Sequence, residues 1–393
     1  MDLAFDDRHD ELQRIARQLF QARSPLAEVR ALEDDEIGYS RPLWREMAAL
    51  DWIGLGQPET HGGSGGALMD LVMICLEMGR ALVPSPLLPS AVVCGSTLVG
   101  EANSAREANS AREAPSAREA RSARADLLAS LFSGDVILAP ALCEATPVYS
   151  PARASVLARP VAGGFRLEGT KLLVPYLQGA QQLLVSASVD SPDTISLFLV
   201  DARRAELIDE QLPNIAGYPL SAVTFDGLEV DEEALVGEVG GGWELLRPAL
   251  ERATVLRCAE IAGAGERVLE MSVDYAQHRK QFGRPIGQFQ AVQYLCSDIA
   301  IATHLTSLLT FQAAWQIDQG LPSTRDVAMA KSYGSRAAQE IVHRAHEVHA
   351  GVGFMMEADL QLYTRRAKHW EFDLGDARYH DEAIARAIEE ALV

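Results

Sequence analysis

The sequence predicts an α+β multidomain fold: an N-terminal α-helical domain, a middle antiparallel β-domain and a C-terminal four-helix bundle. Apolar residues recur at helical spacing over most of the chain before residue 135, and again after Gly240-Gly241-Gly242. Between these parts, short apolar runs separated by turns, with no helix between them, indicate strands in series. We therefore expect domains at 1–135, 136–237 and 238–393.

The N-terminal part is expected to be helical because its apolar residues follow a 3.6-residue period. The supporting positions include Leu12, Ile15, Leu19 and Phe20, then Trp44, Met47, Ala48 and Leu50, then the apolar run Leu68–Leu82. The glycine-rich segment 57–66 lacks a preceding strand and a lysine, which favours a helix connection over a phosphate-binding loop. One more short helix is expected from 125 to 135.

Residues 101–124 form a hexapeptide repeat, twice Glu-Ala-Asn-Ser-Ala-Arg and then two variants of it. Each repeat of six residues advances about 240° around a helix, so the arginines of successive repeats fall on different faces. No apolar stripe results. Pro115 interrupts the middle. We expect a solvated, mobile insertion without a core face.

The middle and C-terminal parts differ in the period of their apolar residues. The expected strands include Ser155–Leu157, Phe165–Leu167, Leu183–Ser188, Ile195–Val200, Val223–Phe225 and Leu228–Val230. The expected helices are 243–278, 287–319, 323–350 and 377–391, which are long enough to pack as a bundle.

Composition and charge narrow the classes of function. The chain has 393 residues and a formal net charge of −20, which argues against non-specific binding to nucleic acid or anionic membrane. Its five cysteines are far apart and form no CxxC pair, so we expect reduced thiols and no structural zinc. The acidic N-terminus lacks the apolar core of a signal peptide, and no apolar run reaches about 18 residues. A cytoplasmic protein without a membrane span is expected.

The segment from His278 to Gln290 stands out between two long helical patterns. It contains Arg279, Lys280, Arg284, two phenylalanines, two glycines and a proline. A helical hairpin needs only a few polar residues and a glycine to turn. Guanidinium groups beside an aromatic side chain also suit a ligand that carries phosphate and an aromatic ring. On the residues alone, a structural turn and a ligand-binding turn both remain open.

Two segments resemble signatures of the acyl-CoA dehydrogenase family. The first is Arg279-Lys280-Gln281-Phe282-Gly283-Arg284-Pro285-Ile286-Gly287-Gln288-Phe289-Gln290, and the second runs from His346 to Phe354. The segment from Tyr363 to His380 resembles an actinobacterial-looking branch of the family that often serves the catabolism of steroids or unusual acyl-CoAs. The resemblance covers nearly all of the chain apart from the hexapeptide repeat.

The resemblance implies FAD as cofactor, bound between the β-domain and the bundle, with a neighbouring subunit covering its adenosine end. Arg279 would bind the pyrophosphate and Phe282 would pack beside an aromatic part of the cofactor. Gln281 and Gln290 would offer amide contacts. Glu347, which stands where the family usually has glutamine, and Gly351 would approach the cofactor through side chain and backbone.

The family's reaction removes the α-proton of an acyl-CoA thioester while a hydride leaves the β-carbon for the flavin, and electrons then pass to an electron-transfer flavoprotein. The chain departs from the family where this chemistry occurs. The usual glutamate base corresponds to Leu374, and an alternative position for the base corresponds to Ala253. Glu251 is the remaining candidate base, while Asp373 and Glu371 are expected to be solvated surface carboxylates.

The middle domain departs from the family as well. The flavin-contacting loop reads Cys143-Glu144-Ala145-Thr146-Pro147-Val148-Tyr149-Ser150-Pro151 and lacks the usual glycine. The segment Gly169-Thr170-Lys171-Leu172-Leu173-Val174-Pro175 lacks the tryptophan and threonine that would lie against the flavin ring.

Three hypotheses follow. The first is a subunit of an FAD-dependent acyl-CoA dehydrogenase that forms a hetero-tetramer with a catalytic sister subunit and acts on a bulky acyl-CoA. The second is a self-sufficient, homo-tetrameric dehydrogenase whose displaced base is Glu251. The third is a non-catalytic scaffold or acyl-CoA binder.

Overall fold

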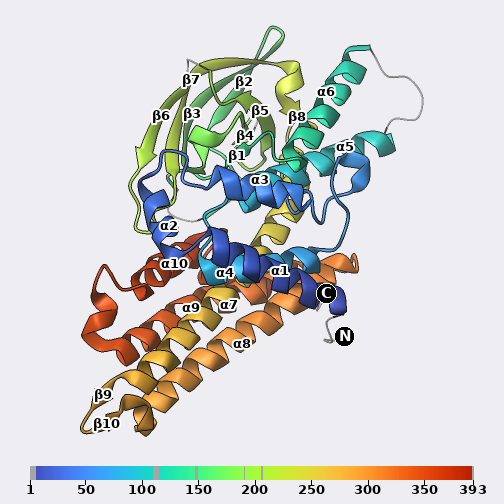
Figure 1. Ribbon diagram of the computed structural model, residues 1–393. Coiled ribbons are helices and arrows are strands. Elements are labelled where there is room, and N and C mark those ends of the chain that lie inside the picture. The colour runs from blue at the N-terminus through green and yellow to red at the C-terminus, as the bar shows by residue number, and fades with distance from the viewer. Residues whose placement is uncertain (1–5, 109–114, 147–148, 190, 205–206, 392–393) are drawn as a thin grey trace. The chain divides into compact units, whose positions relative to one another are not determined.

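The computed structural model describes residues 6–108, 115–146, 149–189, 191–204 and 207–391 (Figure 1). The chain divides into two compact units, each built from separate stretches of sequence. Unit 1 comprises Met1–Ala31, Ala67–Val83 and Thr254–Val393, and unit 2 comprises Leu32–Gly66 and Pro84–Ala253. The division of the sequence at residues 135 and 237 stays a prediction.

Unit 1 is helical, as the apolar periodicity predicts. Its helices are α1 (Asp7–Arg23), α2 (Leu26–Ala31), α4 (Leu68–Ala81), α8 (Gln290–Asp318), α9 (Thr324–His349), α10 (Leu360–Phe372), α11 (Ala377–Ala391) and most of α7 (Gly242–His278). Helix α9 packs against α8, α10 and α11, and α1 packs against α4. The long C-terminal helices confirm the predicted bundle, to which α10 adds a helix that the sequence did not predict.

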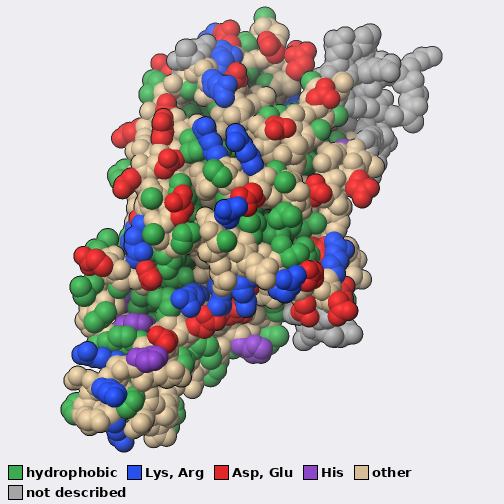
Figure 2. Space-filling model, viewed as in Figure 1, with side chains coloured by type: hydrophobic (Ala, Val, Ile, Leu, Met, Phe, Trp, Pro, Cys, Tyr) green, Lys and Arg blue, Asp and Glu red, His purple; other side chains and the backbone are tan. Residues whose placement is uncertain are grey.

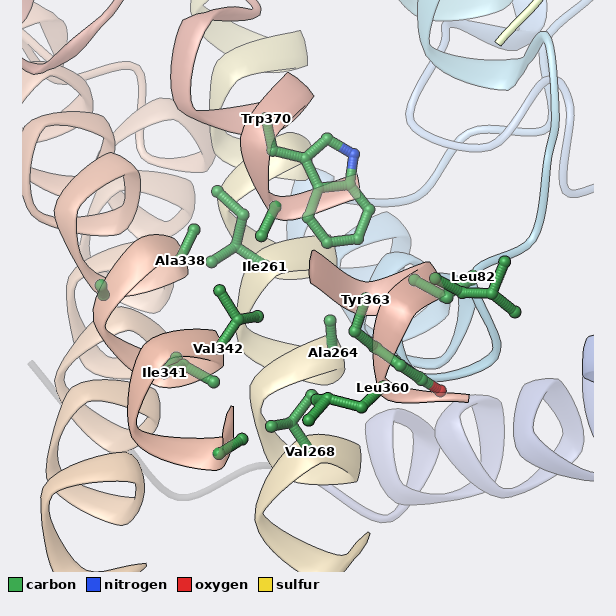
Figure 3. Packing of buried hydrophobic residues seen from close by; sticks show 14 of the residues in the cluster. Leu82, Ile261, Ala264, Val268, Ala338, Ile341, Val342, Leu360, Tyr363 and Trp370 are labelled. Carbon is green, nitrogen blue, oxygen red and sulfur yellow. The ribbon is translucent and has the colours of Figure 1, made fainter. Parts of the chain in front are cut away.

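The core of unit 1 is formed by apolar side chains from α7, α9 and α10, which converge in Figure 3. Ile261, Ile341 and Trp370 are each 2% exposed. Helices α4 and α7 approach so closely that a Cβ atom on Gly79 would lie 1.9 Å from the Glu260 carbonyl oxygen. Glycine is therefore required at this crossing, because any side chain would meet backbone.

Unit 2 contains two four-stranded sheets. Its strands are β1 (Leu138–Ala141), β2 (Leu157–Val161), β3 (Gly164–Pro175), β4 (Gln182–Ala187), β5 (Ser196–Asp201), β6 (Leu207–Leu212), β7 (Leu220–Asp231) and β8 (Leu235–Val236). The strand orders are β1-β4-β5-β8 and β2-β3-β7-β6. The unit also contains helices α3 (Arg41–Ala49), α5 (Ser96–Ala108) and α6 (Pro115–Phe132), a π-helix (Leu87–Gly95) and the first part of α7.

The β-prediction is confirmed in its main features and wrong in one. Among the described strands of unit 2, all pairings are antiparallel except that of β1 with β4, which is parallel. The β2–β3 hairpin lies between these two strands in the sequence, and its return path permits the parallel pairing. Strands β1, β6 and β8 were not predicted. Strand β6 is largely exposed and polar, so no alternation of apolar residues marks it.

Most of the hexapeptide repeat lies within α5 and α6, and its residues 109–114 lie outside the described residues. Its first and last residues pair, with Arg124 Nε 3.4 Å from Glu101 Oε2. The guanidinium of Arg124 also donates to the Glu233 carbonyl oxygen at 3.2 Å. The two ends of the repeat are therefore joined within unit 2, and the predicted mobility of the insertion stays a prediction.

All five cysteines are free, and burial raises the pKa of the Cys258 thiol to about 12. No group of three or more His, Cys, Asp or Glu side chains in the described ranges could hold a metal ion. Among the same residues, no helix is both long and apolar enough to cross a lipid bilayer.

Candidate functional site: a cationic hairpin, an open hollow and a turn without a base

The segment that follows α7 forms a tight β-hairpin. Strands β9 (Lys280–Gln281) and β10 (Arg284–Pro285) pair antiparallel, and Phe282 and Gly283 form the two-residue tip. Their φ values are +54° and +77°. Both are positive, as a type I′ turn requires, and such a value is rare for a bulky residue. The Phe282 side chain is nevertheless 92% exposed. A large apolar side chain is thus held in solvent by an unfavourable backbone conformation, and the predicted binding role of Phe282 stays a prediction.

Cations and aromatic rings alternate on this hairpin. The Arg284 guanidinium carbon lies 4.2 Å from the centre of the Phe289 ring, which meets the Phe282 ring edge-on at 5.9 Å. Arg279 and Lys280 are exposed and form no ion pair with any described residue. In a chain of net charge −20, these cations are available to an anionic ligand. Basic side chains show in blue at this end of unit 1 in Figure 2.

Gln281 and Gln290, the other two predicted binding residues of this segment, form hydrogen bonds with residues close to them in the sequence. Gln281 Nε2 donates to the Lys280 carbonyl oxygen, and Gln290 Nε2 donates to the Tyr294 hydroxyl at 2.7 Å. Both amides are exposed. Their predicted contact with a cofactor stays a prediction.

The second segment ends α9 and lines an open hollow of about 890 Å³. Glu347 and Gly351 both line it, together with Arg344, His343 and Phe354. The Glu347 carboxylate is 54% exposed and lies 3.4 Å from Arg344 NH1. A Cβ atom at Gly351 would meet nothing within 4 Å, so the backbone there is open to close approach.

The two segments are joined by a stacked pair of rings. Tyr275, one turn before Arg279 on α7, stacks on His349 with ring centres 4.7 Å apart. His349 lies between Glu347 and Gly351 in the sequence. The structure therefore brings the two predicted binding segments together at one end of unit 1.

The turn between α10 and α11 contains the position of the usual base. Leu374 occupies it with φ +59°, followed by Gly375 with φ +94°. A left-handed leucine costs roughly 1–2 kcal/mol, so the surrounding structure must hold it. His380 Nε2 donates to the Leu374 carbonyl oxygen at 2.9 Å, and burial lowers the pKa of His380 to about 4.

The carboxylates beside Leu374 are engaged in ion pairs, and their predicted role as solvated surface groups is wrong for Asp373. Its side chain is 27% exposed and accepts a hydrogen bond from Arg257 Nε at 2.9 Å. The other side of the Arg257 guanidinium pairs with Glu260, a buried residue of the same helix. Glu371 pairs with Lys368 at 2.8 Å. An arginine-paired carboxylate is a weak base, because the cation stabilises its ionised form.

Glu251, the candidate base, lies on the part of α7 that belongs to unit 2. Its side chain is 16% exposed, and its carboxylate lies 3.6 Å from Arg247 NH1. Ala253 is fully buried and offers no proton acceptor. Nothing in unit 2 tests a catalytic role for Glu251, which stays a prediction.

Glu144 and Lys171, from the two altered segments of the β-domain, form a buried pair at 2.6 Å, with side chains 6% and 0% exposed. Ser155 donates to Glu144 through both its N–H and its hydroxyl. Burial opposes ionisation of Glu144, but Lys171 and Ser155 outweigh it and hold the pKa of Glu144 below its usual range. Burial nevertheless lowers the pKa of Lys171, so the cost of this pair lies in losing one partner and leaving the other charge buried alone.

Sequence reasoning missed the polar residues that hold the Leu374 turn, namely Arg257, Lys331 and His380. Each lies within a helical pattern, where a polar residue is ordinarily assigned to the solvated face. A lysine among small residues of a helix, with Ala330 before it and Ser332 after it, was the one available signal.

Comparison with known proteins agrees with this architecture. Residues 6–108 match the acyl-CoA dehydrogenase N-terminal domain, and residues 240–389 match the acyl-CoA dehydrogenase C-terminal domain. Benzylmalonyl-CoA dehydrogenase of Aromatoleum aromaticum is 29% identical over 90% of this chain and 91% of its own length. Acyl-CoA dehydrogenase FadE27 of Mycobacterium tuberculosis is 29% identical over 92% of this chain and 91% of its own length.

Solved structures show the same fold. A chain of the ChsE4-ChsE5 complex from Mycobacterium tuberculosis superposes with a TM-score of 0.85 at 28% identity, covering 99% of both chains. A chain of a variant of the steroid enzyme Tcur3481-Tcur3483 gives a TM-score of 0.81 at 28% identity, with 98% of this chain and 99% of that chain covered. Both sequence segments, both domain matches and the fold agree, and the chain belongs to the acyl-CoA dehydrogenase family.

Proposed function

We propose that this chain is one subunit of an FAD-dependent acyl-CoA dehydrogenase and that a catalytic sister subunit supplies the base. The observation that supports this proposal is a contrast between two regions of unit 1. The hairpin keeps its free cations and its exposed phenylalanine, whereas the usual base position holds Leu374 and the adjacent Asp373 is bound to Arg257.

The hairpin and the hollow fit the phosphate-bearing end of FAD. Arg279 would give charge-assisted hydrogen bonds to the pyrophosphate, and Phe282 would pack against an aromatic part of the cofactor. Glu347 lacks an amide donor and repels phosphate, so Gly351 and the backbone around it would make the closer approach. FAD, when bound, would accept the hydride that leaves the β-carbon of the acyl group.

The surface of unit 1 supports a subunit partner. Tyr294, Ile301 and Leu305 on α8 are 60%, 57% and 40% exposed. Their spacing of seven and four residues places them on one face of the helix. Phe354 and Met356 add exposed apolar side chains near the hollow. Apolar stripes of this kind are covered in oligomers. We propose that another subunit of the hetero-tetramer covers the apolar stripe on α8.

The named relatives favour a two-chain enzyme with a bulky substrate. ChsE4-ChsE5 and Tcur3481-Tcur3483 are each named as pairs of proteins, and the second is called a steroid acyl-CoA dehydrogenase. We extend both features to this chain, with α,β-dehydrogenation of a steroid-like or other bulky acyl-CoA as the reaction and electron-transfer flavoprotein as electron acceptor. The five free thiols, three of them buried, suit a reducing compartment, and we propose the cytoplasm.

Flavin content tests this proposal. The chain is purified alone and together with the product of a neighbouring dehydrogenase gene, and bound FAD is measured per chain by absorbance after denaturation. We expect little FAD in the chain alone and substantial FAD in the co-purified complex. Full FAD occupancy of the chain alone would contradict the need for a sister subunit, and a colourless complex would favour a scaffold or acyl-CoA binder.

A further inference from the structure

Lys331 of α9 is a fully buried lysine whose ammonium group binds the end of α10. Its side chain is 0% exposed. Nζ donates to the carbonyl oxygens of Trp370 at 2.9 Å and Gly375 at 2.8 Å, and to Ser335 Oγ at 2.7 Å. The Glu371 carbonyl oxygen lies 3.4 Å from Nζ and accepts from Ser335 Oγ at 3.1 Å. Lys331 forms no ion pair with any described residue, so carbonyl oxygens satisfy this buried cation.

The turn that Lys331 holds has an uncommon backbone. Leu374 and Gly375 are both left-handed, and a Cβ atom at Gly375 would lie 2.6 Å from the Tyr379 ring. The N–H of Asp373 donates to His369 and that of Gly375 donates to Phe372. Between them, the Leu374 N–H has no acceptor among the described residues. A rigid turn with one free N–H is a preorganised hydrogen-bond donor.

We propose that Lys331 is a positioning residue, which holds this turn so that the Leu374 N–H can donate to the thioester carbonyl of an acyl-CoA. The inference rests on the proposed function, because it takes acyl-CoA as the ligand. A backbone donor does not depend on the side chain, so this chain keeps carbonyl recognition although leucine replaces the base. Loss of the ammonium would leave the Trp370 and Gly375 carbonyl oxygens without their buried donor, and the turn would relax.

Protonation of Lys331 gives the inference a second test. Burial lowers the pKa of Lys331 to about 8. The titratable and charged groups that face Lys331 are Arg257 and Cys258 on α7, His369 on α10, Asp373 and Asp376 in the turn, and His380 on α11. The pKa of each histidine is lowered to about 4 and that of Cys258 is raised to about 12. Above pH 8, Lys331 therefore loses one donor, whereas the two histidines and the Cys258 thiol stay neutral.

The test compares octanoyl-CoA with S-octyl-CoA, a thioether that lacks the carbonyl oxygen. Binding to the full chain is measured by calorimetry at about pH 7. We expect the wild-type chain to prefer the thioester roughly tenfold, the usual contribution of one hydrogen bond. Lys331→Met should abolish this preference and leave thioether affinity within about twofold, because only the carbonyl contact is lost. Lys368→Met, an exposed lysine on α10, is the matched control and should keep the preference.

Unchanged preference in Lys331→Met, or no binding of either ligand to the wild-type chain, would overturn the inference. If Lys331→Met does not fold, the wild-type preference is followed from about pH 7 to 9, where it should fall through the lysine pKa. A preference that is constant over this range would also overturn it. Flavin content of the co-purified complex reports on the proposed function separately, so an FAD-containing complex with unchanged preference rejects only the role of Lys331.

Discussion

Arg257 and Asp373 form a charge-assisted hydrogen bond of 2.9 Å between α7 and the turn that carries Leu374. Arg257 also pairs with Glu260, so one guanidinium joins two carboxylates within unit 1. This arrangement explains why a carboxylate next to the usual base position does not replace the base. The Asp373 carboxylate is held by Arg257, and this cation reduces its affinity for a proton.

The pH dependence of stability should report this pair. Burial raises the pKa of Asp373, but Arg257 and the other nearby cations outweigh burial and hold that pKa below its usual range. The stabilisation is therefore present above the unfolded pKa of about 3.9 and is lost as pH falls through the lower folded value. Asp373→Asn should lower the free energy of unfolding by roughly 1–3 kcal/mol at neutral pH. Urea denaturation should show the difference shrinking below about pH 4, and a constant difference would contradict this account.

The buried pair Glu144–Lys171 predicts a large and local effect on stability. Glu144→Gln would leave the Lys171 ammonium buried without its counter-ion, at a cost of about 3–5 kcal/mol. Glu168→Gln is the matched control, since it breaks the exposed Arg159–Glu168 pair on the same sheet, which should cost no more than about 1 kcal/mol. Urea denaturation measures both. Equal effects would show that Glu144 and Lys171 are not a structural pair.

Arg279 should contribute to FAD affinity in the complex. A hydrogen bond to a charged group contributes about 1.5–3 kcal/mol, so Arg279→Ala should weaken FAD binding by about 10–100-fold. Arg378→Ala, on α11, removes a guanidinium that is 85% exposed and should leave FAD affinity unchanged. Equilibrium titration of the apo-complex with FAD measures both variants. Equal FAD affinity of the Arg279→Ala and wild-type complexes would remove the hairpin from the cofactor site.

Substitution of Glu251 distinguishes the hetero-oligomer hypothesis from the hypothesis of a self-sufficient enzyme. If the sister subunit supplies the base, Glu251→Gln should change turnover of the complex by no more than about twofold. A displaced base at this position would instead cost about 10²–10⁴-fold. Glu244→Gln, an exposed carboxylate on the same helix, is the control for charge loss. Turnover is followed by reduction of an artificial electron acceptor with both variants.

The sequence predicted the fold through features that are local in the chain. The helical period, the change to short apolar runs and the two family-like segments correctly placed the bundle, the sheets and a turn after α7. Strand β6 was missed because it is exposed and polar, and the parallel pairing of β1 was missed because register is a long-range property.

The candidate binding residues were easier to find in the sequence than the residues that hold the turn. Arg279 and Phe282 lie on an exposed hairpin, where their chemistry is visible in the sequence. Lys331 contacts carbonyl oxygens about 40 residues away in the chain. A helical lysine is ordinarily solvated, so only the folded chain shows that this one is buried.

Turnover by reconstitution tests the central claim most directly. The chain and its sister subunit are purified separately. Each is assayed with a bulky acyl-CoA in the presence of added FAD, first alone and then mixed. The account predicts no turnover from this chain alone, and turnover from the mixture that is abolished when the sister's glutamate base is changed to glutamine. Turnover by this chain alone, or by a mixture whose sister subunit lacks the base, would contradict it.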